Sequence, residues 1–260
     1  MSALLRREWM RFATAATFLT RAPWIARWAS GEPAELARSA RWFPLVGVLV
    51  GACGAAVYAG ASLLLPTTLA ALLALAATVA LTGAFHEDGL ADAADGLFGG
   101  YTKERRLEIM RDSRIGTFGG IALVLSLALR WQALVVLGPS IAAWVLPAAH
   151  AGARFSSLLL ARALPYVREG APNKPIADGI GAVEATVGGA VTAAALLAWV
   201  IAGGPIAPAL AAIASALVIV GCGRLFAARI GGITGDCLGA ANQVVEIAIL
   251  LVAVAFAAHA

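Results

Sequence analysis

Residues 42–85 read WFPLVGVLVGACGAAVYAGASLLLPTTLAALLALAATVALTGAF, and residues 86–96 continue HEDGLADAADG. The first segment runs for 44 residues without an Asp, Glu, Lys or Arg, and four acids follow within the next ten positions. A helix that spans a bilayer needs about 20 predominantly apolar residues. The uncharged segment therefore predicts two membrane helices, divided near Pro66, with an acidic cluster where the second helix ends.

The whole chain has the composition of a membrane protein. Of its 260 residues, 61% are hydrophobic and 13% are charged, and the mean hydropathy is +0.86. Soluble domains are about 45–50% apolar and about 25% charged. The sequence lacks the alternation of a membrane β-barrel, and Ala, Leu and Gly dominate it. We therefore predict an all-α, polytopic membrane helix bundle that forms a single domain over residues 1–260.

Glycine and proline breakers divide the uncharged tracts into about seven membrane helices arranged in hairpins. Of the 19 Lys and Arg residues, all but Arg130 fall on one side of this arrangement, and the positive-inside rule makes that side cytoplasmic. The placement explains the net charge of +4 without nucleic acid as a partner. We expect a multi-pass protein of the cell inner membrane, with the lipid bilayer as a partner and its active site facing the cytoplasm. The spans are expected near residues 43–65, 67–85, 118–137, 140–161, 183–202, 206–223 and 241–258.

Two segments lie outside these spans. Residues 1–41 are basic and contain three Trp residues, which predicts a cytoplasmic or interfacial helix rather than a span. Residues 86–117 are expected to form a cytoplasmic catalytic segment. The pair Gly47 and Gly51 has the spacing that allows two helices to pack closely.

The acidic cluster has the spacing of a metal site. Asp88, Asp92 and Asp95 follow an i, i+4, i+7 pattern, so on a helix their carboxylates lie along one stripe. Hard oxygen ligands at the aqueous end of a span suit Mg²⁺, which keeps positions for water and substrate phosphates. The alternative is a solvated loop whose acids pair with the nearby bases of residues 103–106.

Several other charged residues are candidates for substrate binding. Arg111 and Arg114 can hold phosphate oxygens or form surface ion pairs. His150 and Arg154 are one helical turn apart within a predicted span, where a basic stripe faces the bundle interior. Asp236 lies in a glycine-rich segment before the last span, which predicts the other half of a site. Arg130 is expected to snorkel or to pair with another helix, with substrate binding as a further alternative. Asn242, Gln243 and Glu246 share one face of the last span.

Two blocks of sequence, residues 85–96 and 110–119, resemble the signature of the cobalamin-5′-phosphate synthase family, the adenosylcobinamide-GDP ribazoletransferases. Residues 18–21, 41–47 and 232–240 are similar to this family in the same order, so the resemblance spans nearly the whole chain. Residues 162–184 match only loosely and carry no predicted site.

The resemblance implies a Mg²⁺-dependent transfer in cobalamin biosynthesis. The ribose hydroxyl of α-ribazole, or of its 5′-phosphate, attacks the cobinamide-side phosphate of adenosylcobinamide-GDP, and GMP leaves. Asp95 and Glu87 are the two candidates for the general base. The resemblance leaves open a homo-oligomer or an association with other cobalamin-pathway enzymes.

Two other functions compete with this interpretation. A CDP-alcohol phosphotransferase also uses spaced aspartates, but its signature needs Ala-Arg where this chain has Gly99 and Gly100. A transporter would place its carboxylates at the membrane midplane between inverted repeats. In this sequence the acids instead stand at the mouth of a predicted helix.

Overall fold

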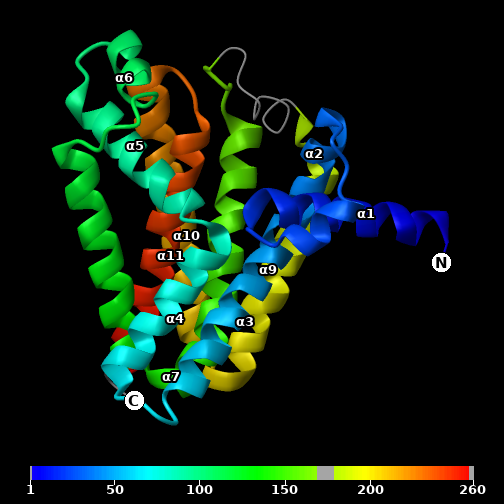
Figure 1. Cartoon of the computed structure of the whole chain (residues 1–260), viewed down its shortest axis with the longest axis vertical. Coiled ribbons are helices and arrows are strands. Elements are labelled where there is room, and N and C mark those ends of the chain that lie inside the picture. Colours follow the sequence, from blue (N-terminus) through cyan, green and yellow to red (C-terminus); the bar gives the residue numbers. More distant parts are fainter. Residues whose placement is uncertain (1, 169–178, 258–260) are drawn as a thin grey trace.

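The computed structural model describes residues 2–168 and 179–257 (Figure 1). Every regular element in these residues is a helix, which confirms the predicted all-α bundle. The elements are α1 (Ala3–Leu19), η1 (Pro23–Trp28), α2 (Pro33–Ser39), η2 (Ala40–Trp42), α3 (Phe43–Ala61), α4 (Thr67–Thr82), α5 (Phe85–Gly99), α6 (Lys103–Ile109), α7 (Thr117–Ala163), α9 (Ala182–Gly203), α10 (Ile206–Ile230) and α11 (Gly235–Ala257).

Within the described ranges, five helical stretches are long and apolar enough to cross a membrane, and the bent pair α4–α5 adds a sixth. One of the five, α7, contains two limbs. Its backbone leaves helical geometry at Gly138 (φ 66°), just before Pro139, and the chain turns back beside itself (Figure 1). Glycine accepts this positive φ at no steric cost, and the proline that follows starts a new helix. When the two limbs of α7 are counted separately, the described helices provide seven candidate crossings, the number predicted.

A sharp bend separates α4 from α5. The two axes differ by 86°, because Gly83 (φ 66°) and Ala84 (φ 57°) both adopt the left-handed conformation. The amide of Ala84 donates to the carbonyl of Val79 at 2.9 Å, which closes the end of α4. The predicted helix over residues 67–85 thus ends at Thr82. The bend directs the start of α5 into the bundle, so Glu87 is buried there rather than exposed in a charged loop.

The last helix begins earlier than predicted. It starts at Gly235 rather than near residue 241, so Asp236 belongs to its first turn and not to a loop. The sequence suggested a loop because glycines are frequent there. Gly239 is needed for a different reason, because a Cβ on it would lie 3.2 Å from the Cα of Gly89 on α5. The preceding helix, α10, also extends beyond its predicted end, to Ile230.

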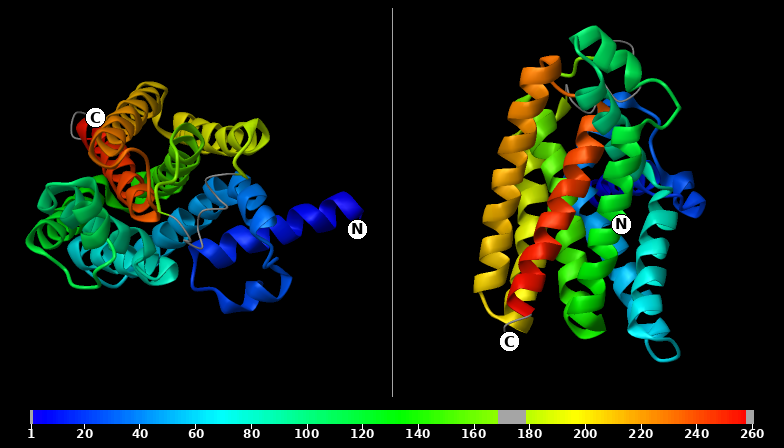
Figure 2. Two further views of the ribbon diagram at one scale, coloured as in Figure 1. Left: turned by 90° about the horizontal axis from the view of Figure 1, so that it is seen from above. Right: turned by 90° about the vertical axis from the view of Figure 1, so that its left-hand side faces the viewer.

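The N-terminal helix α1 runs across the bundle axis and projects away from it (Figures 1 and 2). Leu4, Leu5 and Trp9 are exposed on this helix. An apolar face on a helix that lies across the bundle is the arrangement expected for a segment in the membrane interface.

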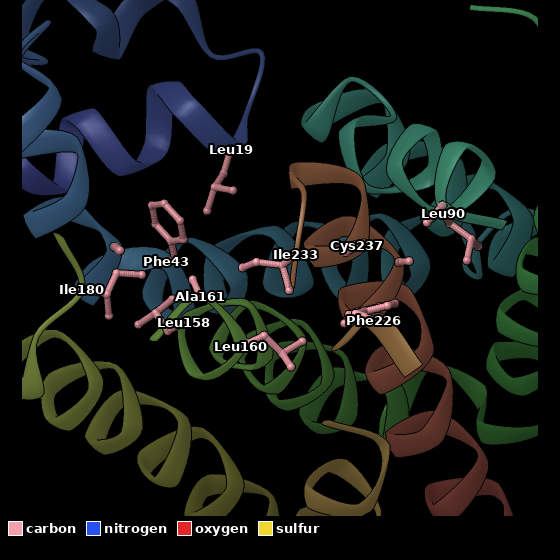
Figure 3. Packing of buried hydrophobic residues seen from close by; sticks show 14 of the residues in the cluster. Leu19, Phe43, Leu90, Leu158, Leu160, Ala161, Ile180, Phe226, Ile233 and Cys237 are labelled. Carbon is pink, nitrogen blue, oxygen red and sulfur yellow. The ribbon is translucent and has the colours of Figure 1, made fainter. Parts of the chain in front are cut away.

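Close glycine contacts pack the centre of the bundle. A Cβ on Gly47 would lie 2.3 Å from the carbonyl oxygen of His150, and a Cβ on Gly51 would lie 2.4 Å from that of Leu146. The spacing of the two glycines on α3 thus brings that helix against the second limb of α7, as predicted. Above this contact, Leu19 and Phe43 point toward one another beside Leu158 (Figure 3). This cluster joins the N-terminal segment to the end of the bundle that carries the acids.

Candidate active site

The carboxylates of Asp88, Asp92 and Asp236 gather at one end of the bundle. Asp88 is exposed and Asp92 is half-buried on α5, while Asp236 is half-buried in the first turn of α11. The two helices touch here, since a Cβ on Gly89 would lie 3.2 Å from the carbonyl oxygen of Asp236. Asp88 and Asp236 are near enough for their charges to act on Asp92. The structure therefore brings the acidic motif of α5 and the Asp236 segment side by side, as predicted.

Asp95 continues the stripe of α5 but has a different environment. It is buried, and its two carboxylate oxygens accept hydrogen bonds from the amides of Gly116 (2.7 Å) and Gly119 (2.9 Å). These amides belong to the start of α7, where backbone N–H groups have no partner within the helix. Asp95 thus caps α7 from a neighbouring helix. The three aspartates share one stripe, but Asp95 is already bonded within the protein.

Glu87 precedes Asp88 on α5 but is buried in the bundle. Its Oε1 accepts hydrogen bonds from Arg130 at 3.0 Å and from Gln243 at 3.3 Å. Arg130 also donates to Glu246 at 3.3 Å, so it bridges α5 and α11 from the first limb of α7. All four side chains are buried. Of the roles expected for Arg130, the structure shows pairing with other helices.

His150 and Arg154 extend this buried network. His150 lies 3.3 Å from Glu246, and Arg154 lies 3.8 Å from the same carboxylate. Arg154 also donates to the Nδ1 atom of His150 at 2.6 Å. Two arginines and two glutamates thus balance in charge inside the bundle, which is how buried ions are tolerated. The sequence placed His150 and Arg154 facing the interior, and their burial confirms that position; Asn242 is buried too.

Arg168 is a site residue that the sequence did not indicate. Its guanidinium donates to the Asp236 carboxylate at 2.9 Å and to the carbonyl of Met110 at 3.2 Å. It therefore links α11 to the segment after α6. Arg168 lies in the region that only loosely resembles the family, and no spacing within the sequence connects it to Asp236.

A short backbone pairing places Arg168. Ile233 donates to the carbonyl of Pro165 at 2.9 Å, and Val167 donates to the carbonyl of Ile233 at 3.0 Å. Gly232 permits this approach, because a Cβ there would lie 2.1 Å from the Pro165 oxygen. Beside it, the hydroxyl of Tyr166 accepts a hydrogen bond from the Gly235 amide at 3.3 Å. Burial raises the pKa of Tyr166, so its hydroxyl stays neutral.

Arg111 and Arg114 lie on the exposed segment between α6 and α7. Arg114 donates to the carboxylate of Asp112 at 3.0 Å, and its side chain is 86% exposed. These hydrogen bonds lower the pKa of Asp112 to about 2. Of the two roles predicted for Arg114, the structure shows the surface ion pair.

The carboxylates at this end of the bundle suit an ion such as Mg²⁺, which takes few protein ligands, better than a metal whose ligands all come from the protein. Within residues 2–168 and 179–257, no three His, Cys, Asp or Glu side chains converge to hold a metal ion. Mg²⁺ often needs only one or two carboxylates, with waters and substrate phosphates completing its shell. Asp88 and Asp92, one helical turn apart and open to solvent, provide such a pair.

These features define a class of protein: a multi-pass membrane protein that gathers carboxylates and arginines at one end of a helix bundle, as a phosphate-bearing substrate requires. The model of the cobalamin-5-phosphate synthase family matches residues 11–254. The chain therefore belongs to this family, and it is an enzyme. Because the match covers residues 11–254, we set aside the two competing interpretations, a CDP-alcohol phosphotransferase and a transporter.

Curated relatives agree with this assignment. A protein named adenosylcobinamide-GDP ribazoletransferase from Ralstonia pickettii is 45% identical over 249 residues, which cover 95% of each chain. Proteins of the same name from Ralstonia nicotianae and Bradyrhizobium diazoefficiens are 43% and 45% identical, covering 98% and 93% of this chain and 99% and 92% of their own. No solved structure matches the chain.

Proposed function

We propose that this enzyme joins adenosylcobinamide-GDP to α-ribazole, or to α-ribazole 5′-phosphate, with release of GMP. The observation that carries the proposal is the 45% identity, along 95% of both chains, to a protein named for this reaction. In the reaction, a ribose hydroxyl oxygen forms a bond to the cobinamide-side phosphorus. The bond from that phosphorus to the oxygen of the departing GMP breaks, and the hydroxyl proton is lost.

Mg²⁺ is the proposed cofactor, with Asp88 and Asp92 as its protein ligands. When bound, the ion would neutralise the diphosphate and polarise the phosphorus toward attack. Asp95 and Glu87, both expected as candidate bases, are buried and bonded to α7 and Arg130. We therefore assign them to holding α5 in place, and we take Asp95 out of the proposed metal shell.

Arginines supply the remaining positive charge. Arg168 is held beside Asp236, and we assign it as a donor to a phosphate oxygen of the diphosphate. Arg111 and Arg114 lie on the exposed segment between α6 and α7. We propose that they bind oxygens of the same diphosphate and restrict its motion. A guanidinium suits this task because its fork donates two parallel hydrogen bonds to phosphate oxygens.

The proposed membrane orientation matches the substrates. The acidic end of the bundle carries the basic segments, so we place it in the cytoplasm, where GDP-linked molecules are made. We also place the protein in the inner membrane.

The direct test is release of GMP by the purified full-length protein. Adenosylcobinamide-GDP is mixed with α-ribazole, with and without Mg²⁺, and GMP and the joined product are quantified together. We expect equal amounts of the two, and loss of both when a chelator removes the metal. Absence of GMP with both α-ribazole and its 5′-phosphate would refute the proposal, and full activity in chelator would refute the metal assignment.

A further inference from the structure

The exposed part of α1 carries two grooves that the function proposed above does not use. α1 projects from the bundle, and the chain folds back beside it through η1 (Figure 2). We call the space between these two elements the basic groove. It has an empty volume of about 980 Å³, part of it open to solvent. Its lining residues are Ala3, Arg6, Arg7, Trp9, Met10 and Trp28.

Positive charge marks the basic groove. Arg6 and Arg7 are exposed, and they follow Ala3 by three and four residues, so the three side chains share one face of α1. Arg27 adds a third guanidinium, which lies 3.8 Å from the centre of the Trp28 ring. A guanidinium donates paired hydrogen bonds to phosphate oxygens. The groove is therefore complementary to an anionic phosphate.

The acid that precedes η1 is used elsewhere. Residues 1–31 contain five arginines and one acid, Glu8. Its carboxylate accepts hydrogen bonds from Arg11 at 2.6 Å and from the Trp42 indole at 3.1 Å. Arg11 also donates to Glu35 of α2 at 2.8 Å. These bonds hold the Glu8 carboxylate toward the start of α3, and they fix the angle at which α1 leaves the bundle.

The second groove offers apolar surface next to the first. It lies between α1 and the start of α3, and its empty volume is about 840 Å³, part of it open to solvent. We call it the apolar groove; Leu5, Phe12 and Leu45 are among its lining residues. Trp9 lines both grooves and meets Trp28 with ring centroids 5.7 Å apart. Basic and apolar surfaces thus adjoin at the start of a helix able to cross a membrane.

This combination suits a lipid better than a soluble phosphate. A free phosphate needs only the arginines, whereas the apolar groove and the exposed Trp24 on η1 suit the bilayer interface, where Trp is frequent. We propose that the two grooves bind one anionic phospholipid, with its phosphate on Arg6 and Arg7 and an acyl chain along Leu5 and Leu45. Binding of this lipid does not depend on the reaction proposed above.

The test measures lipid binding to the purified full-length protein in detergent. Phosphatidylglycerol is titrated, and bound lipid is counted by native mass spectrometry. An arginine near an anionic lipid surface contributes about fivefold to binding. We expect the double variant Arg6→Gln/Arg7→Gln to raise the Kd for phosphatidylglycerol about tenfold or more. The control Arg224→Gln/Arg229→Gln removes the same charge from exposed positions near the end of α10, and it should change the Kd less than about twofold.

A second variant blocks the basic groove and keeps both arginines. Ala3→Glu places a carboxylate three and four residues before Arg6 and Arg7, where it pairs with them and occupies the phosphate position. An acid in the first turn also stabilises a helix, so this change cannot act by unfolding α1. Ala3→Glu should weaken phosphatidylglycerol binding about as much as the double variant. Ala3→Gln, which has the same size without the charge, should bind normally.

Three results would overturn the proposal. Normal Kd values in both Arg6→Gln/Arg7→Gln and Ala3→Glu would remove the lipid from this site, and an equal loss in the α10 control would reduce the effect to net charge. Equal affinity for phosphatidylcholine, a lipid without net charge, would contradict recognition of an anionic lipid. Glycerol 3-phosphate should not displace phosphatidylglycerol at equal concentration; if it does, the site takes a soluble phosphate instead.

Discussion

Asp88 is exposed and Asp92 is half-buried, while Glu87 and Asp95 are buried and bonded within the bundle. We expect Asp88→Asn and Asp92→Asn each to lower kcat by at least about a hundredfold, because each removes a proposed metal ligand whose charge stabilisation is worth several kcal/mol. Glu104→Gln, an exposed change on α6, is the matched control. All three variants should stay folded, and near-normal turnover by both aspartate variants would show that the stripe is only a solvated surface.

Arg168 offers a test of guanidinium geometry. Arg168 contacts both Asp236 and the Met110 carbonyl through Nη2, and lysine at this position keeps the charge but lacks the planar fork that would donate to a phosphate as well. We expect Arg168→Lys to lower kcat/KM for adenosylcobinamide-GDP about tenfold or more. Arg162→Lys, at an exposed position near the end of α7, should be nearly silent. Steady-state kinetics on this pair is decisive, since equally small effects would exclude Arg168 from the phosphate site.

Helices α5, α7 and α11 are joined by the buried ions around Arg130. Removing one member of a buried ion pair leaves its partner uncompensated, which costs about 3–5 kcal/mol, whereas exposed pairs contribute about 0–1 kcal/mol. We therefore expect Arg130→Met to lower the thermal unfolding temperature in detergent far more than Arg105→Met. Arg105 is the matched control because it pairs with Glu108 on the exposed surface of α6. Similar shifts for the two variants would mean that Glu87 and Glu246 do not depend on Arg130.

Helix boundaries were predictable from sequence where a breaker coincides with a real turn. Gly138 and Pro139 divide α7 as expected, because a positive φ followed by proline cannot continue a helix. The bend at Ala84 was not predictable, since alanine rarely adopts a positive φ and nothing local announces it. The early start of α11 was missed because Gly239 serves a contact with α5, which depends on tertiary packing.

The candidate site, like the helix boundaries, was predictable only in part. Charged residues are rare in this chain, so Asp88, Asp92 and Asp236 stood out by type and position alone. The sequence did not show how far each of them is buried, and only the packed helices reveal that Asp95 caps α7. Arg168 depends on a pairing between two connections far apart in sequence. No periodicity could have identified it.

At the scale of the whole molecule, the two ends of the bundle differ in charge. The turns at residues 62–66, 138–140 and 203–205 contain no Lys or Arg, while the opposite end carries the basic segments and the acidic site. Single cysteines at Thr68 and Ser140, both exposed, should therefore label from outside intact cells, in a background with Cys53→Ala and Cys222→Ala. A cysteine at Thr102, the N-cap of α6 at the other end, should label only after the membrane is opened. Labelling in the reverse pattern would invert the protein and place the proposed site on the side that lacks GDP-linked substrates.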